Sequence, residues 1–254
     1  MTLDPTIAMD EHGGWVGFDL TAGHSLICAP TGTGKSATTY RILGEAADDP
    51  RLLVTGVDPS RLLLRPWADI GARVVLGTDI TAYRDVAALW ERTLDKRLAV
   101  LESMSADIDK VATFTPAVPV IRVVLEEYPA VLAAFGQDRK GRSEFERVVK
   151  RLAFEGRKVG MLLLVIIQKP ATEYFDSAMR DQMTLLYSHR LPTTATVEMV
   201  SEELARDPAA VRRMANLRPG EAAFVTRGGR TLWCKTALLG YGAYCAAVRR
   251  RGAA

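Results

Sequence analysis

The sequence predicts an α/β protein in which helices cover both faces of a mainly parallel central sheet. Apolar segments of strand length alternate along the chain with segments of helical periodicity, which is typical of strand-helix-strand units. The run MLLLVIIQ at 161–168 is almost entirely apolar, as expected for a central parallel strand that is buried on both sides. The chain has 254 residues, 48% hydrophobic and 25% charged, so one large globular domain is expected.

Each element in the first half follows from a local pattern. SLIC at 25–28 is a short buried strand, and the helix predicted at 34–47 follows it after a loop. Two further strands are expected at 51–60, where a turn ends the apolar run, and at 72–77. Apolar side chains then recur at helical spacing over 86–101, which predicts a long amphipathic helix on one face of the sheet.

The second half continues the alternation. Weak periodicity and two prolines predict a loop at 103–119, before a strand at 120–127 that ends in two acids. The segment 142–156 is predicted as a helix that stops at Gly156. The remaining elements are the apolar strand at 161–168, a strand at 185–191, one or two helices within 194–217, a hairpin at 221–236 that turns at Gly228 and Gly229, and a frayed tail at 249–254.

Composition excludes several classes of protein. The longest apolar stretch, at 159–167, is much shorter than the roughly 20 residues of a membrane-spanning helix, and the acidic N-terminus does not fit a signal peptide. We therefore expect a cytoplasmic protein without a membrane span. Cys28, Cys234 and Cys245 share no metal-ligand spacing and are interpreted as reduced and structural. The net charge of +3 leaves the kind of partner open.

A phosphate-binding loop is predicted at APTGTGKS, residues 29–36. The pattern requires a glycine, four free positions and then Gly-Lys-Ser/Thr, and only Ala29 departs from it. Lys35 is expected to neutralise the β- and γ-phosphates of ATP, and Ser36 to bind Mg²⁺ at the positive end of the helix. The alternative is a glycine-rich connection without nucleotide, and the spacing disfavours a dinucleotide site. The predicted nucleotide-binding residues are Pro30, Thr31, Gly32, Thr33, Gly34, Lys35, Ser36 and Ala37.

Two acids and an amide complete the predicted catalytic site. Glu126 ends a strand and is expected to bind Mg²⁺, while Glu127 is expected to polarise the attacking water. Gln168 ends the apolar strand and is interpreted as a sensor of the γ-phosphate and the lytic water. The alternatives are a solvated acidic strand end and an ordinary surface glutamine.

Five segments, in order, resemble the motor domain of the FtsK/SpoIIIE DNA translocases, including their plasmid-transfer relatives in actinobacteria. They are GFDLTAGHSLICAPTGTGKS at 17–36, VDPSR at 57–61, VVLEEYPAVL at 123–132, FEGRKVGMLLLVIIQKP at 154–170 and LRPGEAAFV at 217–225. The resemblance implies a RecA-like P-loop NTPase fold. It also implies a lead-in at 1–20, an ATPase motor domain at 21–240, and a C-terminal helix with a basic tail at 241–254.

The chain departs from the family pattern at several of these positions. Glu126 stands where the family has aspartate, and its longer side chain puts the rate of hydrolysis in question. Ile167 and Lys169 replace threonine and arginine around the glutamine, and Ser60 replaces a lysine. Rapid hydrolysis and subunit coupling are therefore less certain expectations than nucleotide binding.

Double-stranded DNA and other copies of the chain are the expected partners. The basic run that includes Arg139, Lys140 and Arg142 suits contact with DNA phosphates, but interleaved acids make a solvated helix face an equal alternative. The resemblance places Arg180, in FDSAMRDQ at 175–182, near DNA. It also implies a hexameric ring in which an arginine from the neighbouring subunit stabilises the transferred phosphoryl group, with Arg190 and Arg157 both open as candidates.

The predicted function is an ATP-dependent translocase motor for double-stranded DNA, in plasmid conjugation, DNA partition or phage DNA handling. A membrane or recruiting partner protein is compatible with this function. One alternative is a nucleotide-gated binding or assembly module that hydrolyses ATP slowly. Others are a viral DNA-packaging ATPase and a small-molecule kinase, of which the five ordered segments disfavour the kinase.

Overall fold

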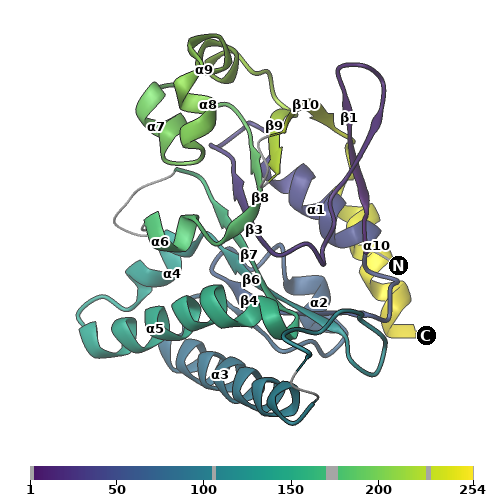
Figure 1. Cartoon of the computed structure of the whole chain (residues 1–254), viewed down its shortest axis with the longest axis vertical. Helices are drawn as coiled ribbons and strands as arrows, with labels where there is room; N and C mark the ends of the chain where they lie inside the picture. Colours follow the sequence, from purple (N-terminus) through teal and green to yellow (C-terminus); the bar gives the residue numbers. More distant parts are fainter. Residues whose placement is uncertain (1–2, 105–106, 170–176, 227–229, 254) are drawn as a thin grey trace.

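The computed structural model describes residues 3–104, 107–169, 177–226 and 230–253. Within these residues one mixed sheet separates two layers of helices (Figure 1). Its ten strands follow one another across the sheet in the order β2 (Trp15–Gly17), β1 (Thr6–Asp10), β10 (Thr231–Thr236), β9 (Glu221–Thr226), β8 (Met183–Ser188), β3 (His24–Cys28), β7 (Met161–Ile167), β6 (Val120–Glu126), β4 (Leu52–Asp58) and β5 (Val74–Leu76).

The sheet has a parallel part and an antiparallel part. The six strands from β8 to β5 are parallel, which confirms the expected mainly parallel sheet. β9, β10, β1 and β2 extend it with antiparallel pairs. The sequence did not predict β1 and β2, because β2 has only three residues and its Trp15 is 63% exposed, so no buried run marks it.

Two groups of helices cover the two faces, as predicted. One face is covered by α1 (Lys35–Glu45), α2 (Arg65–Asp69) and α10 (Tyr241–Ala253). Helices α3 and α5 lie side by side on the other face (Figure 1). The elements on that face are α3 (Ile80–Glu102), α4 (Tyr128–Ala134), α5 (Arg139–Glu155), the 3-10 helix η1 (Gly156–Val159), α6 (Ser177–Arg180), α7 (Thr194–Glu198), α8 (Glu202–Arg206) and α9 (Pro208–Ala215).

The central strand β7 contributes to the cores on both faces. Side chains of successive strand residues point to opposite sides of a sheet. Met161, Leu163, Val165 and Ile167 accordingly pack against the α3 and α5 face, whereas Leu162, Leu164 and Ile166 pack against the α1 and α10 face. All seven side chains are buried, which explains why this segment of the sequence has no polar face.

Short polar signals set the ends of the helices. Asp79 accepts hydrogen bonds from the backbone N–H groups of Thr81 and Ala82, where α3 begins. α5 ends at Glu155, and the predicted stop Gly156 is its C-cap, where a side chain would clash with the carbonyl oxygen of Met161. Between residues 194 and 217 the chain forms three short helices instead of one or two, since Ser201 and Asp207 each cap a new helix.

The C-terminal residues correct one prediction. The tail at 249–254 was expected to be frayed, but α10 continues to Ala253. Its Arg251 donates hydrogen bonds to the carbonyl oxygens of Ala47, Asp49 and Leu52, which fix the end of the helix to the sheet. The predicted hairpin is the antiparallel pair β9 and β10, and its turn at Gly228 and Gly229 lies outside the described residues.

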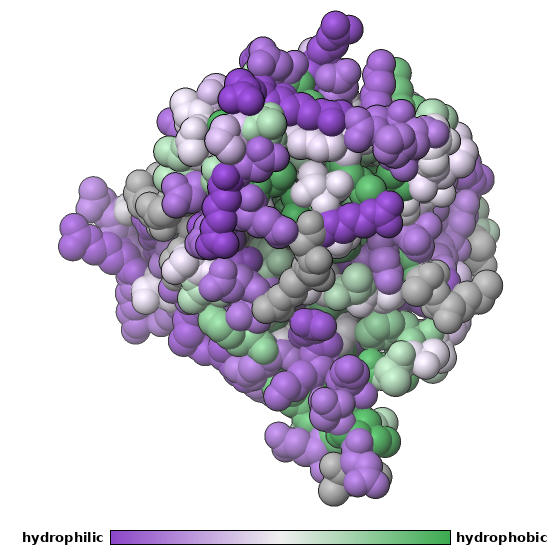
Figure 2. Space-filling model, turned by 45° about the horizontal axis from the view of Figure 1, so that its top comes forward, coloured by the Kyte–Doolittle hydropathy of each residue, from purple (hydrophilic) through white to green (hydrophobic). Residues whose placement is uncertain are grey.

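The described helices include none that is both long and apolar enough to cross a bilayer. Figure 2 shows one face of the molecule, on which hydrophilic residues predominate and apolar residues are visible only in small patches. This face therefore exposes no broad apolar surface.

The burial of β7 leads to a test of stability. Leu164→Ala removes a fully buried side chain and is expected to lower the free energy of unfolding by about 2–5 kcal/mol. Leu53→Ala is the matched control on β4, because Leu53 is 44% exposed, and it should cost about 1 kcal/mol or less. Urea denaturation measures both losses, and equal losses would contradict the role of β7 as the central buried strand.

Candidate nucleotide-binding site

The residues predicted from the sequence meet at one edge of the parallel sheet. The carboxyl ends of parallel strands lie at the same edge, and ligands of open α/β sheets bind there. The loop at 29–34 follows β3, Glu126 ends β6, and Gln168 follows β7. β7 lies between β3 and β6, so three elements that are distant in sequence reach the same place.

The backbone of the loop explains which of its glycines are needed. Gly32 and Gly34 have φ angles of +79° and +125°, in the region that favours glycine. Ala29 is absent from the described residues with positive φ, so its position does not require glycine. It is fully buried, and its N–H donates to the carbonyl of Ile167 over 3.0 Å. The substitution at residue 29 is therefore compatible with the loop.

The Lys35 ammonium lies between the two predicted acids. Its Nζ is 3.1 Å from Oε1 of Glu126 and also contacts Oε1 of Glu127. Burial opposes the charge on Lys35, but the two carboxylates outweigh it and raise the lysine pKa above its ordinary value. The lysine is therefore charged and held where the loop meets the end of β6.

One carboxylate oxygen of Glu126 is available to bind a metal ion. Burial raises its pKa from 4.5 to about 7, against the lowering effect of Lys35. Its second oxygen, Oε2, is buried and has no hydrogen-bond partner among the described residues. A buried carboxylate oxygen without a partner fits a hydrated Mg²⁺, which binds through one or two carboxylates, phosphates and water. Ser36 is exposed in the first turn of α1, directly after Lys35.

Glu127 has a strained backbone. Its φ and ψ are 49° and 55°, the left-handed conformation that residues other than glycine rarely adopt. Such strain costs on the order of 1–3 kcal/mol and is concentrated at functional sites. Here it lies between the end of β6 and the start of α4, where the side chain of Glu127 reaches Lys35.

Gln168 is joined directly to the loop. Its Oε1 accepts a hydrogen bond from the Thr31 hydroxyl over 3.0 Å, although its side chain is exposed. The structure thus brings the predicted sensor beside the predicted phosphate loop.

Sequence reasoning assigned no role to two buried residues at the same edge. Asp58 ends β4, and its carboxylate accepts from the Ser60 hydroxyl over 2.6 Å and from the Leu64 N–H over 2.9 Å, so it holds the VDPSR turn. His189 follows β8 and lies against the phosphate loop. A single histidine within an apolar strand carries no sequence signal of this position.

The two candidate arginines lie at opposite edges of the sheet. Arg190 is exposed and follows His189, so it lies at the edge that holds the phosphate loop. Arg157 is exposed on η1, which precedes β7 and therefore lies at the other edge.

The predicted DNA-binding residues differ in how freely they are exposed. Arg139 and Lys140 are exposed at the start of α5, where Lys140 lies 3.9 Å from Glu144, and Arg142 pairs with Glu146 at 3.1 Å. Arg180 is only 18% exposed and pairs with Glu202 at 2.8 Å. The first residues of its segment, 175 and 176, lie outside the described residues.

Farther along α5, basic side chains pair with acids on α3, although Arg147 is 54% exposed. Arg147 contacts Glu91 at 2.6 Å. Arg151 contacts Glu91 and Asp95, both at 2.9 Å. This part of the basic run therefore joins α5 to α3 through ion pairs.

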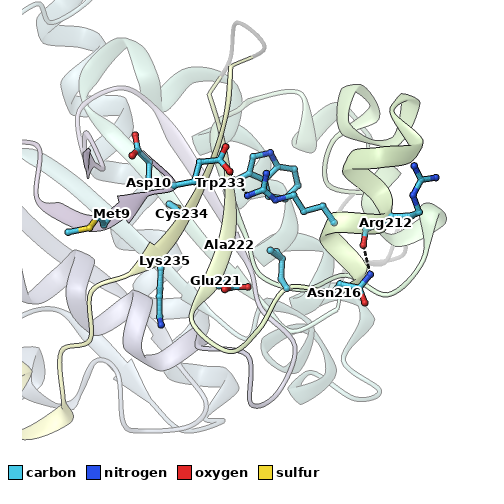
Figure 3. Close-up of a pocket in the computed structure, with 12 residues that line it drawn as sticks. Met9, Asp10, Arg212, Asn216, Glu221, Ala222, Trp233, Cys234 and Lys235 are labelled. Atoms are coloured by element: carbon cyan, nitrogen blue, oxygen red, sulfur yellow. Dashed lines mark hydrogen bonds and ion pairs between the residues drawn. The ribbon is translucent and has the colours of Figure 1, made fainter. Parts of the chain in front are cut away.

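A cavity of about 430 Å³ lies away from these residues, on the antiparallel side of the sheet (Figure 3). It is bordered by β1, β10 and α9. The Arg213 guanidinium lies 4.3 Å from the centre of the Trp233 ring and 2.7 Å from Glu11. None of the site residues predicted from the sequence lines it.

No family model and no curated protein matches the sequence, whereas many solved structures are similar. The pCW3 conjugation coupling protein TcpA, in a monomer form with ATPγS, is 17% identical with a TM-score of 0.75, over 97% of this chain and 70% of that chain. The cytoplasmic domain of the Thermomonospora curvata type VII secretion ATPase EccC is 16% identical with a TM-score of 0.73, over 98% of this chain and 31% of that chain.

A viral protein has a weaker likeness. The genome packaging NTPase of Sulfolobus turreted icosahedral virus 2, in complex with AMPPCP, is 11% identical with a TM-score of 0.51, over 86% of this chain and 99% of that chain. These likenesses confirm the fold that the resemblance implies. The chain has the RecA-like α/β fold of P-loop ATPase motor domains.

The raised pKa of Glu126 gives a pH-dependent prediction. A carboxyl whose pKa rises from 4.5 to about 7 on folding stabilises the protein below pH 4.5, and this contribution is lost as the pH rises through 7. Glu126→Gln cannot ionise. The unfolding free energy of this variant, relative to that of the wild type, should therefore rise by on the order of 2 kcal/mol between pH 5 and pH 8. Urea denaturation without nucleotide measures the difference, and parallel pH curves for the two proteins would contradict the prediction.

Proposed function

We propose that the chain binds ATP and Mg²⁺ at residues 30–37 and hydrolyses the ATP. The observation that carries this proposal is the position of Lys35 between Glu126 and Glu127, beside a Gln168 that is bonded to the loop. Bound ATP supplies the phosphoryl group that is transferred to water, and Mg²⁺ offsets its charge. The unpartnered oxygen of Glu126 and the Ser36 hydroxyl would hold the metal.

The catalytic roles follow from the same contacts. Lys35 exchanges its carboxylate partners for phosphate oxygens when the nucleotide enters. Glu127 is then free to accept the proton of the attacking water, which is the task of a general base. Gln168 is placed to bond that water, because its amide has both a donor and an acceptor.

We further propose that hydrolysis moves double-stranded DNA. The resemblance to DNA translocases, and the fold shared with a conjugation coupling protein and a genome packaging NTPase, support this cargo. The same fold occurs in a secretion ATPase, so the choice of DNA rests on the five segments and on the exposed basic residues. The cited chains of TcpA and EccC are longer than this one, and their activities remain properties of those proteins.

A hexameric ring would complete each site with an arginine from a neighbouring subunit. Arg157 is our candidate, because it lies at the edge of the sheet opposite to the phosphate loop of its own chain. An arginine there meets a nucleotide only if a second copy presents it. Arg190 lies at the edge of its own loop and is proposed to act within the chain. Mass measurement with ATP and DNA present tests the ring.

One observation favours the slower alternative, a nucleotide-gated binding module. A Glu126 that is protonated near neutral pH binds Mg²⁺ less well than an ionised carboxylate, which would slow hydrolysis. In this alternative ATP binding, and not turnover, controls assembly with a partner. The stimulation of turnover by DNA separates the two.

ATP turnover tests the motor proposal. Lys35→Ala and Glu127→Gln should each lower turnover by about 100-fold or more, because one removes phosphate neutralisation and the other the general base. Lys96→Ala and Glu102→Gln change the same residue types at exposed positions of α3, and they should stay within about twofold of the wild type. Long duplex DNA should stimulate the wild type.

The outcomes separate the two functions. The motor proposal would be wrong if DNA does not stimulate ATP turnover and Glu127→Gln leaves turnover unchanged. Saturable ATP binding with slow turnover that DNA fails to stimulate would support the gated module.

DNA binding tests the basic residues at the start of α5. Removal of both Arg139 and Lys140 by alanine substitution should weaken binding to any duplex and lower the slope of log affinity against log salt by about 2, since each lost phosphate contact contributes about 0.9. Arg147→Ala is the control, because Arg147 is already paired with Glu91. A control that lowers the slope as much as the double variant would contradict this assignment.

A further inference from the structure

His189 is buried directly beneath the phosphate loop. Its backbone N–H donates to the carbonyl of Cys28 over 2.8 Å, which brings it to the end of β3. A Cβ atom on Gly34 would lie 2.9 Å from Cε1 of the imidazole and 3.2 Å from the backbone nitrogen of Gly220. The ring and this turn therefore support the loop from the side of the antiparallel strands.

Both nitrogens of the imidazole are used, and their roles are determined by their partners. Nδ1 lies 2.9 Å from the carbonyl oxygen of Glu221, which only accepts, so Nδ1 carries the hydrogen. Nε2 of the neutral ring must then accept, and it lies 2.9 Å from the Thr38 hydroxyl on α1. Burial lowers the pKa of His189 to about 4, which keeps the ring neutral at physiological pH.

This tautomer orders a chain of hydrogen bonds across the sheet. Because the Thr38 hydroxyl donates to His189, it accepts from Thr236 at 3.1 Å. Thr236 in turn accepts from the Tyr187 hydroxyl at 2.8 Å, and Tyr187 accepts from the Cys234 thiol at 3.5 Å. In this series of hydrogen bonds each hydroxyl or thiol hydrogen is donated once. The direction of every bond in the series is therefore set by the tautomer of His189.

A second link joins the loop to the same strands through the backbone. The Gly220 N–H donates to the carbonyl of Thr33 over 2.8 Å, and the Gly220 carbonyl accepts from the Thr236 N–H over 2.8 Å. Figure 3 labels Glu221 and Cys234, which belong to the neighbouring strands β9 and β10. Cys234 is the first donor of the network, and the carbonyl of Glu221 accepts from His189 at its other end. The antiparallel strands thus hold both the loop and the first turns of α1.

We propose that His189 is a positioning residue for nucleotide binding, which fixes Gly34 and Thr38 so that the N–H groups of the loop face the phosphates before the nucleotide arrives. The proposal rests on the proposed function, because it assigns the cause of preorganisation in that same site. Its mechanism is local: without the acceptor at Nε2, the buried Thr38 hydroxyl keeps its contact with Thr236, but the hydrogen bond that joins α1 to the ring beneath Gly34 is lost.

The helix itself offers a matched pair of variants. Thr38→Val and Thr39→Val make the same nearly isosteric change at neighbouring positions that are 0% and 2% exposed. The Thr38 hydroxyl contacts His189 and Thr236 in the network, whereas the Thr39 hydroxyl bonds the carbonyl of Ser36 within its own helix. A purely structural role of the hydroxyls would affect both variants alike.

Two readouts are measured on the full chain. The first is the dissociation constant for Mg²⁺-ATPγS, for which Thr38→Val should be weaker by about 10-fold and Thr39→Val by less than about threefold. The second is amide hydrogen exchange over residues 31–36 without nucleotide, which should accelerate in Thr38→Val alone. If the wild type binds no nucleotide, the proposed function fails, while the exchange rates still test the positioning role.

If Thr38→Val does not fold, two variants of His189 test the same hydrogen bond. His189→Gln places an amide near the position of Nε2 and should keep the bond to Thr38. His189→Asn places its amide near Nδ1 and removes the acceptor that residue 189 offers to Thr38. We expect His189→Asn to bind ATPγS about 10-fold more weakly than His189→Gln and to exchange faster at residues 31–36. Equal affinities and equal exchange rates in both matched pairs would overturn the proposal.

Discussion

The contact of Lys35 with Glu126 and Glu127 is the interaction on which the rest of the site depends. Lys35 lies beyond the loop that follows β3. Glu126 ends β6 and Glu127 comes directly after it, and β3 and β6 are not neighbours in the sheet. The lysine and the acids meet because β7 lies between these strands as a parallel strand whose two faces are both buried. The apolar core and the charged site are therefore consequences of the same arrangement, since parallel strands bring their carboxyl ends to one edge.

Charge and backbone strain are concentrated at this edge. Glu126 is buried with one unpartnered oxygen, and Glu127 adopts a left-handed backbone. Either feature alone lowers stability, and a folded chain retains such features where function requires them. Lys35 offsets part of the cost through its charged contacts with both carboxyl groups. A phosphate that enters the loop would compete for this lysine and release the acids.

The parallel and the antiparallel strands of the sheet contribute different groups to the site. The parallel strands carry the charged groups, whereas the antiparallel strands β9 and β10 support the phosphate loop through His189, Gly220 and Thr236. The LRPGE segment, prominent in the sequence but without an evident role, is the turn that makes this contact.

By itself, the sequence determined the alternation of strands and helices, the phosphate loop, and the acids and amide at the strand ends, because these depend on local periodicity and spacing. The tertiary structure decided what depends on contacts between distant segments. β1 and β2 form the outermost strands on one side of the sheet, and Arg251 holds the last turn of α10. Arg180 pairs with Glu202, and His189 lies beneath Gly34. A histidine, a short edge strand or a salt bridge has no periodic signal, since its partner lies far away along the chain.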